Sequence, residues 1–75
     1  MNAQQRKLLA ELRDELTIIM DKIEQIKEEE EEKYDNLPEA LQDSEKGDKF
    51  QENIDTLDDV WNTLSDACDT LEEVE

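Results

Sequence analysis

The sequence has no histidine, and its 75 residues include one glycine, one proline and one cysteine. Without histidine, the chain lacks the side chain that most often acts as a general base or a metal ligand near neutral pH. A single glycine excludes the glycine-rich loops that hold phosphate groups. A single cysteine, Cys68, excludes an internal disulfide and is typical of a reducing compartment. These absences argue against an enzyme.

The residues that are present give no catalytic or metal site either. The hydroxyl groups have no basic partner at helical spacing, and Cys68 lies among acids rather than in the electropositive setting of a reactive thiol. The segment Asp43–Asp48 has the carboxylates of an EF-hand loop, but its glycine is the fifth residue where the motif needs the sixth. A carboxylate-bound metal pair would need a Glu-x-x-His pattern. We therefore expect no catalytic residue, no cofactor and no metal site.

Long apolar stretches are also missing. The chain turns polar within its first few residues, and no run approaches the ~18 apolar residues of a membrane span. We therefore expect a soluble, cytoplasmic protein. Only 35% of the residues are apolar, and the aromatic ones are Tyr34, Phe50 and Trp61. A core of this size contributes at most about 3–5 kcal/mol, so we expect association with another chain.

What the sequence does contain is a regular apolar pattern in its last third. Large apolar residues recur there with gaps of 4, 3, 4, 3, 4 and 3, the a/d heptad pattern of a helix that packs along another helix. The positions are Phe50, Ile54, Leu57, Trp61, Leu64, Cys68 and Leu71. We predict a helix over about residues 48–74.

A second heptad pattern predicts a first helix over about residues 3–34. Its apolar positions are Leu9, Leu12, Leu16, Ile19, Ile23 and Ile26. The run Glu28–Glu32 near its end favours a helix by propensity. Repulsion within the run and the helix dipole oppose it, so we expect this part of the helix to be the weakest.

The connection over residues 35–47 contains the glycine and the proline. Asn36 and Glu39 form a candidate capping box, which predicts a short helical turn over Leu37–Gln42. Ser44 or Asp48 is the candidate N-cap of the second helix.

Two long helices with a short connection should pack antiparallel. In the register that matches both patterns, Leu12 faces Cys68. The same register brings Arg6 and Arg13 toward Glu72, and Lys27 toward Asp58. We therefore predict an all-α helical hairpin, a single domain over residues 1–75 that can form a homodimeric four-helix bundle.

Several apolar residues lie beside the two patterns and at the same height along the hairpin. They define a predicted association patch of Ile18, Met20, Val60 and Trp61. A second copy could cover it in a four-helix bundle, or a different protein could dock there. The patch could also be the ordinary apolar surface that every protein exposes.

The net charge of −16 lies entirely in the second part of the chain, because residues 1–27 carry five basic and five acidic groups. Spread over a final helix of about 39 Å, it amounts to roughly one charge per 2.4 Å, against one per ~1.7 Å in duplex DNA. Solubility alone needs only about 2–8 charges on a small domain. Such a surface repels nucleic acid and anionic membranes and attracts basic proteins.

The carboxylates predicted to bind such a partner face outward from the second helix or belong to the acidic run. They are Asp55, Asp58, Asp59, Asp66, Asp69, Glu72, Glu73, Glu28, Glu29, Glu31 and Glu32.

The connection and the residues around it, Tyr34-Asp-Asn-Leu-Pro-Glu-Ala-Leu-Gln-Asp-Ser-Glu-Lys-Gly47, resemble a turn of small acidic helical proteins encoded by phages and other mobile elements. That turn has the form Tyr-x-Asn-x-Pro-Glu-x-Leu-Gln-x-Ser-x-Lys-Gly. The resemblance covers the turn, and it covers the helices by pattern only. It supplies no functional residues. It implies a setting, the host cytoplasm, in which small proteins often block host nucleases by occupying their DNA-binding surface.

We therefore predict a non-enzymatic protein-binding module. The leading hypothesis is a phage-type anti-defence inhibitor that presents a DNA-like acidic surface to a basic groove on a nuclease or other DNA-binding host enzyme. The alternatives are an adaptor hairpin that associates through the apolar patch, and an acidic chaperone of a basic protein. Salt separates the hypotheses, because charge mimicry weakens steeply with ionic strength whereas apolar docking does not.

Overall fold

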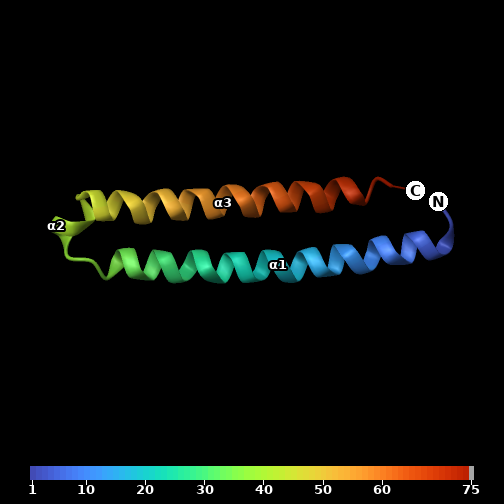
Figure 1. Ribbon diagram of the computed structural model, residues 1–75, viewed down its shortest axis with the longest axis horizontal. Helices are drawn as coiled ribbons and strands as arrows, with labels where there is room; N and C mark the ends of the chain where they lie inside the picture. Colours follow the sequence, from blue (N-terminus) through green and yellow to red (C-terminus); the bar gives the residue numbers. More distant parts are fainter. Residues whose placement is uncertain (75) are drawn as a thin grey trace.

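The computed structural model describes residues 1–74; Glu75, one of the acids counted above, lies outside the described residues. Two long helices, α1 (Ala3–Asp35) and α3 (Glu45–Leu71), run antiparallel and are joined through the short helix α2 (Glu39–Gln42), with both termini at the same end (Figure 1). The prediction of an all-α helical hairpin is confirmed for these residues.

The hairpin is a narrow rod. Its Cα atoms span 59 × 15 × 11 Å with a radius of gyration of 17.3 Å. A compact chain of this length would have a radius of gyration of about 11 Å. The rod therefore exposes much more surface than a globule would, and its core is thin.

Helix α1 starts at a capping box that the heptad pattern does not indicate. The Asn2 side chain accepts a hydrogen bond from the backbone N–H of Gln5 at 2.8 Å, and the Gln5 side chain accepts one from the backbone N–H of Asn2 at 3.3 Å. The helix then continues without a break through the acidic run. Two lysines offset part of the repulsion there. The Nζ atom of Lys33 lies 3.2 Å from a carboxylate oxygen of Glu30, and that of Lys27 lies 3.8 Å from a carboxylate oxygen of Glu31.

The N-cap predicted for the short helix, Asn36, is wrong, whereas one of the two N-caps predicted for the second helix, Ser44, is confirmed. Asn36 ends α1 as its C-cap, and Pro38 precedes α2 because its extended backbone lets its carbonyl accept the first helical bonds, from the backbone N–H groups of Leu41 and Gln42. Ser44 is the N-cap of α3. Helix α3 consequently begins at Glu45, one turn before the predicted start, and it ends at Leu71.

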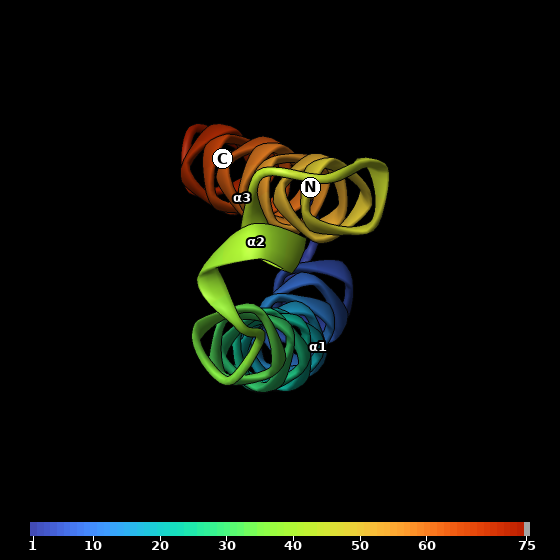
Figure 2. The ribbon, with the colours of Figure 1, turned by 90° about the vertical axis from the view of Figure 1, so that its left-hand side faces the viewer.

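Three residues of the connection hold the two long helices together at this end, where α2 lies between them (Figure 2). The Gln42 side-chain amide donates to the carbonyl oxygens of Tyr34 at 3.2 Å and Leu37 at 3.1 Å. The Ser44 hydroxyl donates to the Leu41 carbonyl. Gly47 is buried so tightly that an added Cβ would lie 2.0 Å from the Gln42 carbonyl oxygen. The glutamine, serine and glycine of this connection therefore have structural roles.

Helix α3 turns its predicted apolar positions toward α1, and Ile54, 9% exposed, is the most buried of them. Helix α1 does not follow its prediction. Leu9, Leu16 and Ile23 are half-buried, but the three apolar positions that alternate with them are about half exposed. These are Leu12 at 50%, Ile19 at 46% and Ile26 at 50%.

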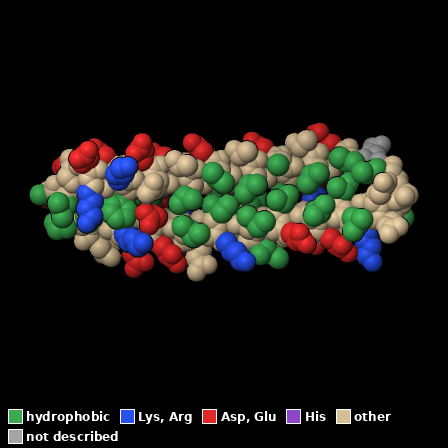
Figure 3. All heavy atoms as spheres, viewed as in Figure 1, with side chains coloured by type: hydrophobic (Ala, Val, Ile, Leu, Met, Phe, Trp, Pro, Cys, Tyr) green, Lys and Arg blue, Asp and Glu red, His purple; other side chains and the backbone are tan. Residues whose placement is uncertain are grey.

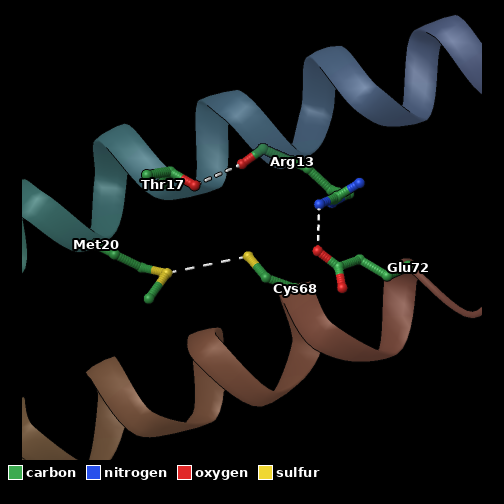
Figure 4. Close-up of polar contacts among 5 residues, drawn as sticks. All are labelled: Arg13, Thr17, Met20, Cys68 and Glu72. Carbon is green, nitrogen blue, oxygen red and sulfur yellow. Dashed lines mark hydrogen bonds and ion pairs between the residues drawn. The ribbon is translucent and has the colours of Figure 1, made fainter.

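The residues one position further along α1 face α3 instead. Met20 is buried, 8% exposed, and its sulfur lies 4.0 Å from the sulfur of Cys68, so the predicted pairing of Cys68 with Leu12 is wrong (Figure 4). Arg13 forms an ion pair with Glu72, and Lys27 forms one with Asp58 at 3.0 Å. Long basic side chains can cover apolar surface with their methylene groups while their charged ends reach an acid. These contacts explain the rotation of α1.

Candidate interaction surfaces

The exposed acids of α3 form two adjacent lines along its outer side. Residues seven apart occupy the same side of a helix, and Glu45, Glu52, Asp59, Asp66 and Glu73 follow this spacing. Asp48, Asp55 and Asp69 form the second line, interrupted by Asn62. We call these eight carboxylates the acidic ridge. All eight are exposed, and none forms an ion pair with another described residue.

The ridge includes five predicted binding residues and three that the sequence analysis missed. Glu45 lies before the predicted start of the second helix and Asp48 was considered as its N-cap, whereas Glu52 lies inside the predicted helix but was not among the predicted binding residues. The seven-residue spacing from Glu45 to Glu73 would have identified the longer line. In Figure 3, acidic side chains follow the upper edge of the molecule, along α3.

Asp58 and Glu72, also predicted to face a partner, are turned toward α1 and occupied by its cations. The hydrogen bond to Asp58, 3.0 Å long, raises the pKa of Lys27 above its ordinary value of 10.5, so this lysine stays charged at neutral pH. Of the two arginines expected near Glu72, Arg13 makes the ion pair, whereas Arg6 lines the same hollow without an ion pair to another described residue. Asp58 and Glu72 therefore belong to the scaffold.

The acidic run of α1 contributes fewer free carboxylates than predicted. Glu28, Glu29 and Glu32 are exposed, whereas Glu30 and Glu31 are half-buried beside lysines. The run therefore extends the anionic surface toward the turn end of the rod.

Charge density along the rod can now be compared with that of DNA. Sixteen net negative charges over 59 Å correspond to about one charge per 3.7 Å. A single strand of DNA has about one charge per 3.4 Å of axis, and a duplex has twice that density. The spacing of roughly one charge per 2.4 Å expected from the sequence overestimates the charge density, because the charge is distributed along both helices and the turn.

The four residues of the predicted association patch do not form one surface. Ile18 and Met20 are two positions apart, which places them about 200° apart around a helix, and accordingly Ile18 is 54% exposed whereas Met20 is buried. Trp61 is half-buried between the helices, and its indole N–H is buried without a hydrogen-bond partner among the described residues. Val60, the fourth residue of the predicted patch, is exposed.

No helix in the described part of the chain is both long and apolar enough to cross a membrane. Comparisons of the chain with protein-family models, with curated proteins and with solved structures gave no match. We therefore infer function from the charge and geometry of the hairpin.

Proposed function

We propose that this protein is a non-enzymatic inhibitor that presents its acidic ridge to the basic DNA-binding surface of another protein. One observation carries the proposal: seven exposed carboxylates follow one side of α3 over its whole length, an eighth, Glu73, continues the line just past its end, and none forms an ion pair with a cation of the described chain. A solvated face that only maintains solubility needs fewer charges.

The helical scaffold suits this role because it fixes the carboxylates before binding. Backbone hydrogen bonds set the spacing along α3, and the Arg13–Glu72 and Lys27–Asp58 ion pairs connect it to α1 at two heights. A binding surface that is ordered in advance loses less conformational entropy on association. A linear density of about one charge per 3.7 Å, close to that of one DNA strand, complements a groove lined by Lys and Arg.

In this proposal the partner is a nuclease or another DNA-binding enzyme of host defence, in keeping with the phage-like turn. The protein itself would bind neither nucleic acid nor membrane, since both repel its surface. The turn residues Gln42, Ser44 and Gly47 would only maintain the hairpin, and the ridge would make the contacts.

The test compares two variants of equal charge. Replacing Asp55, Asp59 and Asp66 by Lys reverses the centre of the ridge, whereas replacing Glu11, Asp14 and Asp21 by Lys makes the same charge change on exposed positions of α1. The immobilised protein is incubated with host lysate at low salt, and bound proteins are eluted with duplex DNA. We expect a DNA-binding enzyme in the eluate, about 100-fold weaker binding by the ridge variant and little change with the α1 variant.

Salt and competition separate the alternatives. Binding through the ridge should weaken at least about tenfold between ~50 and ~200 mM salt. If both triple variants bind the partner equally weakly, a role specific to the ridge is contradicted. A partner that remains bound in duplex DNA and in high salt would exclude DNA mimicry and favour an apolar docking surface. An acidic chaperone would share the salt dependence but would not compete with DNA for one enzyme.

A further inference from the structure

One face of the hairpin combines an unpartnered apolar line on α1 with a charge-free line on α3. On α1, Leu8, Leu12, Ile19 and Ile26 are each about half exposed, with gaps of 4, 7 and 7 that place them on one side of the helix. Rotation of α1 toward Met20 left them outside the core. With Ile18 and Val60, they are the exposed large apolar residues between the two ends of the described rod.

On α3 the neighbouring positions contain no charge, although the helix is rich in acids. With gaps of 3, 4, 3, 4 and 3, they are Asn53, Thr56, Val60, Thr63, Ala67 and Thr70. Ile26 and Glu30 of α1 and Asn53, Thr56 and Leu57 of α3 line one shallow hollow of about 300 Å³, which places the two lines on the same face. Figure 3 shows hydrophobic side chains as a band between α1 and α3 along most of the rod.

Two of the three threonines of this face already have hydrogen-bonded hydroxyl groups. The Thr63 hydroxyl donates to the Asp59 carbonyl and the Thr70 hydroxyl to the Asp66 carbonyl, both at 2.9 Å. Because these donors are already satisfied within α3, covering them leaves no hydroxyl without a partner. Their methyl groups then add to the apolar contact area.

We propose that this face is a homodimer interface, on which a second copy packs face to face with its long axis reversed. The two-fold axis passes near Ile19 of α1 and, within one helical turn, near Thr63 of α3. These two residues lie at similar heights, because the ion pairs Arg13–Glu72 and Lys27–Asp58 are on either side of both.

The two lines are compatible with this symmetry. About Ile19, Leu12 of one copy lies opposite Ile26 of the second copy, and Ile19 lies opposite itself. With the axis near Thr63, Thr56 of one copy lies opposite Thr70 of the second copy. Val60 of one copy lies within one residue of the position opposite Ala67 of the second copy. No acid faces an acid across the centre of the interface. Two chains of charge −16 can therefore associate while their acidic ridges stay on the outside.

Two charged residues of α1 favour the orientation in which the long axis of the second copy is reversed. Glu15 and Lys22 are the charged residues of the α1 line between Leu8 and Ile26, one on each side of Ile19, and neither has an ion-pair partner among the described residues. In the reversed orientation Glu15 of each copy lies opposite Lys22 of the second copy, twice in the dimer. A parallel arrangement of the two α1 helices would place like charges opposite each other.

Sedimentation equilibrium of the full chain tests the interface, with far-UV circular dichroism as a check on folding. We expect a dimer for the native sequence and a dissociation constant at least about 100-fold higher for Ile19→Asp. Ile18→Asp is the matched control, because Ile18 is adjacent to Ile19 and similarly exposed (54% against 46%) but lies about 100° away from it around α1, off the proposed face. A monomeric native protein, or equal weakening by Ile18→Asp, would overturn the proposal.

A charge exchange tests the orientation with surface changes that leave the fold intact. Glu15→Lys should weaken the dimer about tenfold, since it replaces two attractive pairs by two repulsive ones. Combining it with Lys22→Glu should restore the native dissociation constant. A double variant as weak as Glu15→Lys alone would exclude the reversed packing.

Discussion

Trp61 combines the largest side chain of the α3 pattern with an unsatisfied donor. Its indole N–H is buried without a hydrogen-bond partner among the described residues, and a buried donor in that state costs about 1–3 kcal/mol. Trp61→Phe removes the donor and keeps most of the apolar contact, so we expect the midpoint of urea unfolding to stay the same or rise. Trp61→Ala should cost about 3 kcal/mol, close to the whole stability of a small domain.

Circular dichroism in a urea series measures both variants at one protein concentration. The phenylalanine variant serves as the control for the alanine variant, because only the alanine removes the aromatic ring. If Trp61→Phe lowers the free energy of unfolding as much as Trp61→Ala does, the indole N–H of Trp61 has a hydrogen-bond partner in solution.

At the scale of elements, the connection depends on Gly47, whose role is close packing. Alanine is favoured over glycine in a helix by about 1 kcal/mol. At position 47, however, an added Cβ would lie 2.0 Å from the backbone oxygen of Gln42. We expect Gly47→Ala to destabilise the hairpin by about 1–3 kcal/mol in thermal unfolding, whereas Lys46→Ala at the exposed neighbouring position should be nearly neutral. A stabilised Gly47→Ala variant would contradict the close approach of α2 and α3.

The two long helices also show what the sequence could predict. Helix α3 has one line of large apolar residues, so its inner face followed from the spacing alone. Helix α1 offered two lines that share Leu9, Leu16 and Ile23. One adds Leu12, Ile19 and Ile26; the other adds Arg13, Met20 and Lys27. Hydropathy favours the first, but the second reaches Glu72 and Asp58, and only the three-dimensional arrangement shows that these acids are within reach.

The candidate site was predictable to the same degree. Asp55, Asp59, Asp66, Asp69 and Glu73 lie exposed on the outer side of α3 as the pattern indicates. Asp58 and Glu72 required knowledge of the α1 rotation. The exposed line at Leu12, Ile19 and Ile26 could not be recognised, because a periodic pattern does not tell whether a helix packs on its own hairpin or on a second copy.

For the whole molecule, the two proposed surfaces should respond to salt in opposite directions. The Debye length falls from about 10 Å at 0.1 M to about 3 Å at 1 M, so added salt screens the repulsion among sixteen net negative charges. Folding and dimerisation bring these charges together, so we expect the unfolding temperature to rise and the dimer dissociation constant to fall between 0.1 and 1 M NaCl. Binding of a basic partner to the ridge should weaken over the same range.

Thermal unfolding and sedimentation equilibrium in one NaCl series measure these effects. Replacing Asp55, Asp59 and Asp66 by Asn is the control, because it lowers the repulsion without touching the apolar face and should reduce the salt dependence of both quantities. A dimer that dissociates as salt is added would mean that ridge acids of one copy contact cations of the other, in addition to the two Glu15–Lys22 pairs. The same ridge could then not serve the dimer and an external basic partner at once. A dimer strengthened by salt leaves both ridges accessible, at a combined density close to that of duplex DNA.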